Sequence, residues 1–177
     1  MILQQVKNEL ANGCVKKRHP FRYFTLGTLK NDRPRQRMVV LRKIRSDFGL
    51  LFYTDSRSCK VGELKKNPNV SALFYHPKKM MQLQITGEAF FEQDKDTLKK
   101  VWCSIPIHAR RDYTTTMPPG YELGDLDNLE YHVDQNFFCM IIIRPLQIDY
   151  LKLDKPYHQR VRFQKSDDGW SHTQLVP

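Results

Sequence analysis

Three features are missing from this sequence: an export signal, a long apolar run and paired cysteines. Residues 1–13 carry neither the basic segment nor the extended apolar core of a signal peptide. The longest apolar run, residues 137–143, is far too short to cross a bilayer as a helix. The cysteines form no CxxC pair and no Cys/His metal spacing. We therefore expect a cytoplasmic protein with reduced thiols at Cys14, Cys59, Cys103 and Cys139.

The common catalytic signatures are also absent. There is no GxSxG motif for a nucleophilic serine and no GxGxxG loop for a dinucleotide. The histidines that a metal site would need are scattered and form no HxH or HxxxH pair, and we interpret them as solvated or core residues. Five of the six histidines of the chain are His76, His108, His132, His158 and His172.

Charge is plentiful but uneven. The chain carries 29 Lys and Arg against 19 Asp and Glu, a net charge of +10. Nucleic acid, an anionic membrane surface or a phosphorylated ligand could each account for this excess. No Lys or Arg lies between Arg111 and Arg144, whereas six acidic residues do. This uneven charge argues against a surface that binds nucleic acid uniformly.

At 177 residues the chain is long enough for one domain with a real core.

The apolar pattern predicts a mainly β protein with a few short helices. We expect helices at residues 2–12, where Gly13 ends the helix, at 59–66, and from a cap at Asp94 to Trp102. Seven or eight strands, paired in sequence order, predict an antiparallel barrel. They begin near residues 21, 37, 50, 69, 81, 137, 146, 159 and 169, those at 137 and 146 being continuous past Pro145. Residues 103–135 form an irregular excursion, either a functional lid or an ordered surface loop without a role.

One stretch concentrates groups that suit an anion. Ser58 is a candidate N-cap, so free backbone N–H groups are expected to point outward where the helix begins. Lys60 lies in its first turn, and Arg37 and Arg42 belong to a preceding strand. Donors, helix dipole and cations could converge there on a phosphate. The spacing alone leaves open a simpler interpretation, a capped surface helix beside a basic strand.

The same stretch carries a resemblance to a known family. The ordered segments are PRQRMVVLR (34–42), FYT (52–54), SCK (58–60), NPNVSALFY (67–75) and QLQITGEA (82–89). In this order and spacing they resemble the pyridoxamine 5'-phosphate oxidase family, from about residue 21 to 91 and again from Pro145 onward. The resemblance implies an FMN-binding split β-barrel, FMN as cofactor, and a homodimer with FMN at the subunit interface.

The resemblance also assigns cofactor contacts. Cys59 stands where the family usually has Arg, so one charge is missing from the phosphate loop. Gln82 matches a Gln that reaches FMN from the neighbouring subunit, and Tyr150 stands at a usual Trp. His158 matches a family His and is the best candidate for acid–base catalysis. The remaining implied contacts are Arg37, the backbone of Met38, Val39, Val40 and Leu41, then Arg42, Tyr53, Thr54, Ser58, Lys60 and Arg160.

The substrate positions match poorly. Val101, Ile105 and Pro156 stand where the family's Tyr, Arg and Arg would contact substrate. Loss of these groups predicts weak binding of a phosphorylated substrate.

Three functions follow from these features. The first is an FMN-dependent oxidoreductase acting on an unidentified small molecule. The second is a flavin-binding protein without turnover. The third is a basic β-barrel that binds RNA or single-stranded DNA by stacking on Tyr23, Phe24, Tyr53 and Tyr75.

Overall fold

A computed structural model describes residues 1–177 apart from the side chain of Leu126. Its nine described strands form one antiparallel sheet in the order β2-β1-β5-β6-β7-β4-β3, and the hairpin β8–β9 extends from β7. The strands are β1 (Tyr23–Lys30), β2 (Arg33–Val40), β3 (Lys43–Ile44), β4 (Leu50–Asp55), β5 (Asn69–His76), β6 (Met81–Phe91), β7 (Phe138–Lys152), β8 (Gln159–Ser166) and β9 (Gly169–Leu175). The helices are α1 (Ile2–Val15), α2 (Cys59–Lys66), α3 (Lys95–Ser104) and α4 (Ile107–Arg110), with 3₁₀ turns η1 (Pro20–Arg22), η2 (Pro77–Lys79), η3 (Arg111–Tyr113) and η4 (Leu126–Asn128).

The sheet curls into a split barrel, which confirms the expected fold class. The expected pairing of strands in sequence order is wrong in two places, because β1 pairs with β5 and β4 pairs with β7. The structure has one strand more than the seven or eight expected, since Lys43–Ile44 forms a separate short strand, β3, that the pattern did not predict. Partners separated by many residues are chosen by burial in the folded chain, which local patterns do not encode.

Local signals predicted several elements well. Helix α2 has the expected bounds, and Asp94 accepts a hydrogen bond from the backbone N–H of Thr97 at 2.8 Å. Along β6, Met81, Leu83 and Ile85 are buried, as the alternation required.

Several boundaries differ from the prediction: β2 begins at Arg33 instead of near residue 37, and α3 ends at Ser104 instead of Trp102. Helix α1 continues past Gly13 to Val15, because this glycine serves a close contact instead of ending the helix. A Cβ at Gly13 would lie 2.6 Å from the carbonyl oxygen of Phe21. The strand expected from Phe21 begins at Tyr23, since Pro20–Arg22 forms a 3₁₀ turn against α1.

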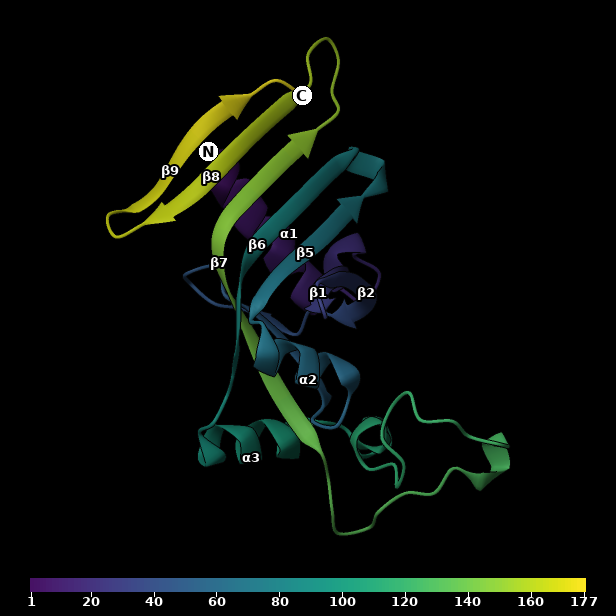
Figure 1. Ribbon diagram of the computed structural model, residues 1–177. Helices are drawn as coiled ribbons and strands as arrows, with labels where there is room; N and C mark the ends of the chain where they lie inside the picture. Colours follow the sequence, from purple (N-terminus) through teal and green to yellow (C-terminus); the bar gives the residue numbers. More distant parts are fainter.

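The core lies on the concave side of the sheet, where α1 covers it (Figure 1). It is rich in fully buried aromatic rings, including Phe24, Phe52, Phe74 and Tyr150. Strand β7 runs the length of the molecule, pairing with β4 through its first half and with β8 through its second.

No helix in the described part of the chain is long and apolar enough to span a membrane. All four cysteines are free thiols.

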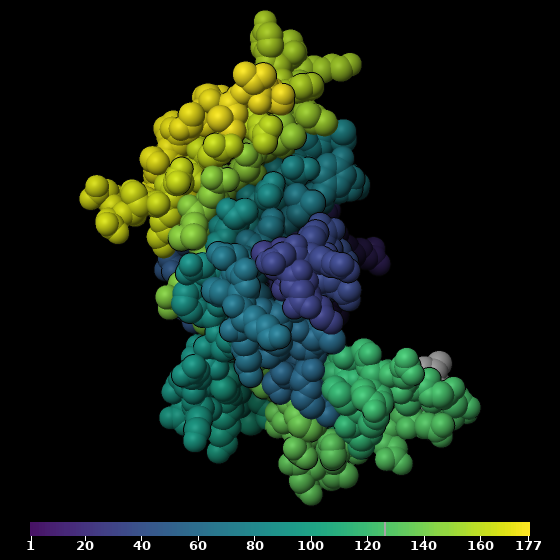
Figure 2. Space-filling model, in the orientation of Figure 1, coloured from purple at the N-terminus to yellow at the C-terminus, as the bar shows by residue number. Residues whose placement is uncertain are grey.

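The irregular segment expected at 103–135 covers residues 105–137 in the structure, between α3 and β7, and is called the excursion below. Its described elements are α4, two 3₁₀ turns and an isolated β-bridge between Thr115 and Tyr131. In the space-filling view the excursion stands off to one side and meets the barrel at its lower end (Figure 2).

Candidate functional site

The loop between β4 and α2 builds a polar corner. Ser58 is the N-cap residue of α2 and is buried, but its hydroxyl makes no capping bond. Its Oγ instead lies 3.2 Å from Oγ1 of Thr54, which also accepts a hydrogen bond from Nζ of Lys60 at 2.9 Å. The helix start therefore keeps two hydroxyls and an ammonium group beside its first turn.

Arg37 approaches the same corner from β2. Its Nη2 donates to Oε2 of Glu63 at 2.7 Å, and Nη1 contacts the hydroxyl of Thr28. Thr28 also donates to Oε2 of Glu63 at 2.6 Å. Burial alone would raise the pKa of Glu63, but these donors outweigh it and hold the pKa below its ordinary value. We call Thr28, Arg37, Thr54, Ser58, Lys60 and Glu63 the basic corner.

Each carboxylate near Lys60 already has a cationic partner. Burial lowers the pKa of Lys60 and the nearby Arg37 guanidinium lowers it further, whereas Asp55 and Glu63 act in the opposite direction. Arg57 binds Asp55, and Arg37 together with Thr28 binds Glu63. An anion with several oxygen acceptors would relieve the cations and use the hydroxyl donors, so the groups present fit a phosphate.

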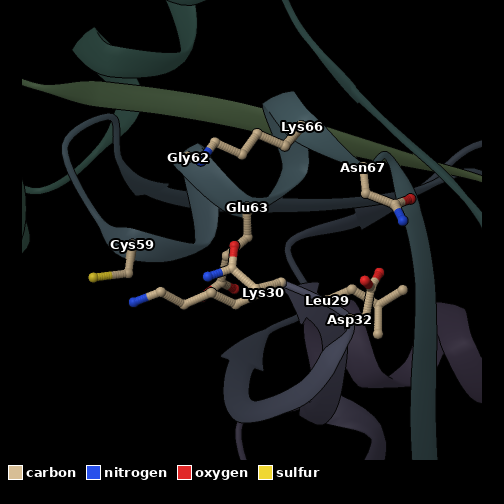
Figure 3. A pocket seen from close by; sticks show the side chains of 9 residues that line it. Leu29, Lys30, Asp32, Cys59, Gly62, Glu63, Lys66 and Asn67 are labelled. Carbon is tan, nitrogen blue, oxygen red and sulfur yellow. The ribbon is translucent and has the colours of Figure 1, made fainter.

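A cavity of about 500 Å³ opens along α2 beside this corner. Figure 3 shows Lys30 and Lys66 entering it from opposite sides, with Glu63 between them and the exposed Cys59 thiol at one end. Glu63 belongs to both the corner and the cavity, and its Oε1 has no hydrogen-bond partner among the described residues. The cavity therefore continues the basic corner toward solvent.

A wall of aromatic rings stands on the other side of β4. Arg42 lies 5.3 Å from the ring centroid of Tyr53, and Tyr53 meets Phe138 edge-on at 5.1 Å. Trp102 and Tyr113 also pack on Phe138. Burial raises the pKa of both Tyr53 and Tyr113, so these phenols stay protonated near neutral pH. Arg42 thus lies with the aromatic wall and not in the basic corner with Arg37.

The remaining predicted residues on β2 alternate in direction. Met38 is exposed, whereas Val39 and Leu41 point into the core and Val40 is half-buried. The backbone N–H of Leu41 donates to Arg22, which fixes the end of the strand.

A second group of predicted residues lies at the opposite end of the sheet. Gln82 and Arg160 flank Leu151 in one cross-strand row, and Nε of Arg160 donates to Asp149 at 3.1 Å. His158 is exposed in the preceding loop, with Nδ1 about 3.2 Å from the backbone N of Asp154. The ring of Tyr150 is fully buried in the core, so within one chain it offers no surface to a flavin.

The structure does not bring these two groups together in one chain. Thr54 pairs with Cys139 near the start of β7, whereas Arg160 pairs with Leu151 near its end. Twelve residues of strand separate those positions, roughly 40 Å at the usual rise per residue.

Three apolar residues occupy the positions where the family has its substrate-contacting Tyr, Arg and Arg. Val101 packs against the cluster of Leu51, Met140 and Ile142, Ile105 is buried, and Pro156 is exposed in the loop before β8.

The fold also assembles a cluster that the histidine spacing did not reveal. Glu9, His19 and His76 have ligand atoms within 4.8 Å of one another. Nδ1 of each histidine accepts a backbone N–H, from Phe21 and from Lys79 respectively. The ring proton must then sit on Nε2, whereas a metal-bound histidine usually donates from its other nitrogen. The cluster is therefore a hydrogen-bonded anchor for α1, which Lys79 completes by pairing with Glu9.

Several residues of the site were missed from the sequence. Glu63 and Thr28 had no motif, although an acidic residue between Val61 and Leu64 in a basic helix was a usable signal. Tyr113 comes from the irregular region, where no periodicity marks a buried side, whereas Trp102 lies in the predicted helix, whose pattern gave it no role in a site.

Comparison with known proteins gives a consistent result. Residues 2–93 match the family model of the pyridoxamine 5'-phosphate oxidase FMN-binding domain. The chain is 26% identical over 157 residues to the dihydrophenazinedicarboxylate synthase of Pseudomonas chlororaphis, covering 82% of this chain and 69% of that protein. It is 30% identical over 120 residues to the pyridoxine/pyridoxamine 5'-phosphate oxidase of Psychrobacter cryohalolentis, covering 68% of this chain but only 50% of that relative's length.

A solved structure supports the fold over the full length. The pyridoxamine 5'-phosphate oxidase-related, FMN-binding protein of Nostoc punctiforme superposes with a TM-score of 0.82 at 21% identity. The superposition covers 100% of this chain and 98% of that one.

Proposed function

Because this chain belongs to the pyridoxamine 5'-phosphate oxidase family and carries its FMN-binding domain, we propose that it is a single-domain, FMN-dependent oxidoreductase acting on a small molecule. The observation that carries the proposal is the basic corner, where the half-buried Lys60 donates to Thr54 beside the Arg37–Glu63 pair and makes no ion pair of its own among the described residues. Holding two cations close together raises the free energy of the protein without ligand, and a bound phosphate lowers it.

Each part of the chain has a task in this proposal. Arg37, Lys60 and the hydroxyls of Thr54 and Ser58 hold the phosphate, and Cys59 adds no charge there. The backbone of residues 38–41, with Arg42 and Tyr53, orients the ring system. Bound FMN supplies two-electron redox chemistry, while the protein supplies binding, orientation and exclusion of water.

We propose a homodimer in which the second copy completes each site. Gln82 and Arg160 lie too far from the basic corner to serve the same flavin within one chain. The convex face between the two groups also exposes apolar side chains, with Met38 61% and Tyr75 50% exposed and Leu73 beside them. A contiguous apolar face of this kind is typical of an interface. His158 would then reach the flavin from the second subunit as the candidate acid or base.

The substrate is proposed to lack a phosphate group. Val101, Ile105 and Pro156 offer no charged donor, and the excursion contributes six acidic side chains, from Asp112 to Asp134. Relatives of this chain bear the names of a phenazine synthase and of pyridoxine phosphate oxidases, so substrates differ within the family. Turnover of pyridoxine 5'-phosphate at a micromolar KM would overturn this part.

The deciding experiment is titration of the purified protein with FMN, followed by FMN fluorescence and absorbance. The proposal expects tight, roughly equimolar binding, and a folded protein that takes up no FMN contradicts it. Mixing the loaded protein with NADH or NADPH and then with candidate acceptors separates an enzyme from a flavin carrier. Reduction without reoxidation by any acceptor would favour the carrier.

A further inference from the structure

Arg57 lies in the loop immediately before Ser58 and was not among the residues expected to contact a cofactor. Its guanidinium clamps the carboxylate of Asp55, with Nε 3.1 Å from Oδ1 and Nη2 2.8 Å from Oδ2. Only 20% of the Arg57 side chain and 2% of Asp55 is exposed. A bidentate, mostly buried pair holds geometry better than a surface ion pair does.

The same guanidinium also binds backbone carbonyl groups of the excursion. Nη1 donates to the carbonyl oxygen of Thr116 at 3.0 Å, and Nη2 donates to that of Thr115 at 2.7 Å. The guanidinium carbon Cζ lies 3.3 Å from the ring centroid of Phe137, the last residue of the excursion before β7. The excursion has two limbs, the segment that leaves the barrel and the segment that returns to β7. The Arg57 side chain therefore contacts both limbs and the end of β4.

The two limbs are joined to each other where Arg57 holds them. Thr115 bridges to Tyr131, and the backbone N–H of Thr116 donates to Glu130 at 3.0 Å. The N–H of Ser56 donates to the carbonyl of Phe137 at 2.7 Å, so the loop before α2 is itself tied to the excursion. A displacement of the excursion must therefore pull on the loop that carries Ser58 and leads into Lys60.

Arg57 is not a substitute for the charge that Cys59 lacks. Its Nε, Nη1 and Nη2 all donate to Asp55 or to excursion carbonyls, so a phosphate would have to break this clamp to recruit it.

We propose that Arg57 is a positioning residue that couples the excursion to the phosphate-binding loop. With the clamp closed, Ser58 and Lys60 are held where a phosphate needs them, and the excursion stands as a fixed wall beside the flavin. Coupling is reciprocal, so FMN bound at the loop must also hold the excursion more firmly. This inference rests on the proposed FMN site.

The test compares FMN with riboflavin, which lacks the phosphate. Arg57→Ala is expected to weaken FMN binding about tenfold or more and riboflavin binding by less than about threefold, because the phosphate loop is what moves. Arg57→Lys, which cannot clamp both sides, is expected to fall between. Arg18→Ala, at an exposed arginine, is the matched control and is expected to bind both ligands as the wild type does.

Cleavage by a glutamate-specific protease gives the reciprocal readout, since Glu122 and Glu130 lie in the excursion. FMN is expected to slow cleavage there in the wild type but not in Arg57→Ala. Equal loss of FMN and riboflavin binding would mean a merely structural role and overturn the coupling, as would unchanged FMN binding by Arg57→Ala. A wild-type protein that binds no FMN would remove the proposed function and this inference together.

Discussion

The two ends of β7 differ in how complete they are. At the first end, Arg37, Glu63, Thr54 and Lys60 are already connected by internal hydrogen bonds and charge. At the second end, Gln82 and His158 lie at or near the surface, and the Arg160 guanidinium hydrogen-bonds to Asp149 and to no other described residue. The first end has a connected set of donors and the second does not. This difference is expected if, as proposed, each end supplies part of a site that a second copy completes.

The largest effect is expected from breaking the first end. Arg37→Met leaves Glu63 buried without its cation, which should destabilise the protein by about 3 kcal/mol. For a chain of this size that lowers Tm by roughly 6–12 °C. The double variant Arg37→Met/Glu63→Gln removes the stranded charge and should recover most of the loss in thermal unfolding. An unchanged Tm in the single variant would show that the pair is not holding the corner.

A second change separates ligand binding from stability at the same end. Lys60→Ala removes a cation whose burial already lowers its pKa, so the empty protein should keep its Tm. FMN binding should weaken roughly 10- to 100-fold, the value of one charge-assisted hydrogen bond to phosphate. Fluorescence titration measures this. A Kd equal to that of the wild type would place the phosphate elsewhere.

A third change should strengthen the first end. Cys59→Arg returns a cation to the start of α2, beside the basic corner. We expect FMN to bind up to roughly tenfold more tightly. Cys59→Ser is the control, which removes the thiol without adding charge and should bind as the wild type does. Weaker binding by the Arg variant would contradict the proposed position of the phosphate.

The smallest effect concerns the cluster of Glu9, His19 and His76 that anchors α1, and it is a pH dependence of stability. Burial lowers the pKa of His19 from its ordinary value of 6.5, so the folded state favours the neutral ring. The stabilisation that the neutral His19 ring contributes is fully present above pH 6.5. It is lost as the pH falls through the lowered pKa of His19. For Glu9, Lys79 and His19 outweigh the effect of burial and lower the pKa from 4.5, so its contribution is lost only in stronger acid.

Between pH 7 and pH 5 we therefore expect Tm to fall by roughly 2–4 °C. The variant His19→Gln, which does not titrate, should lose this part of the decrease. An identical pH profile in both proteins would assign the effect to another group.

Local features could be predicted from the sequence, and long-range ones could not. The cap at Asp94, the bounds of α2 and the alternation of β6 depend on neighbours in the chain. The Arg37–Glu63 pair and the grip of Arg57 on Thr115 join residues 26 and 58 positions apart, so no spacing rule reveals them. The resemblance supplied Arg37, Ser58 and Lys60, but it could not show that Tyr150 turns into the core.

The central claim is that each flavin site combines the basic corner of one copy with Arg160 of another. Arg160→Ala and Lys60→Ala can be coexpressed with different tags and the mixed dimer purified. In that dimer one site carries both changes and the other carries neither. The account predicts one FMN per mixed dimer at wild-type affinity, whereas each parent variant binds weakly. A mixed dimer that binds no better than its parents would contradict the claim.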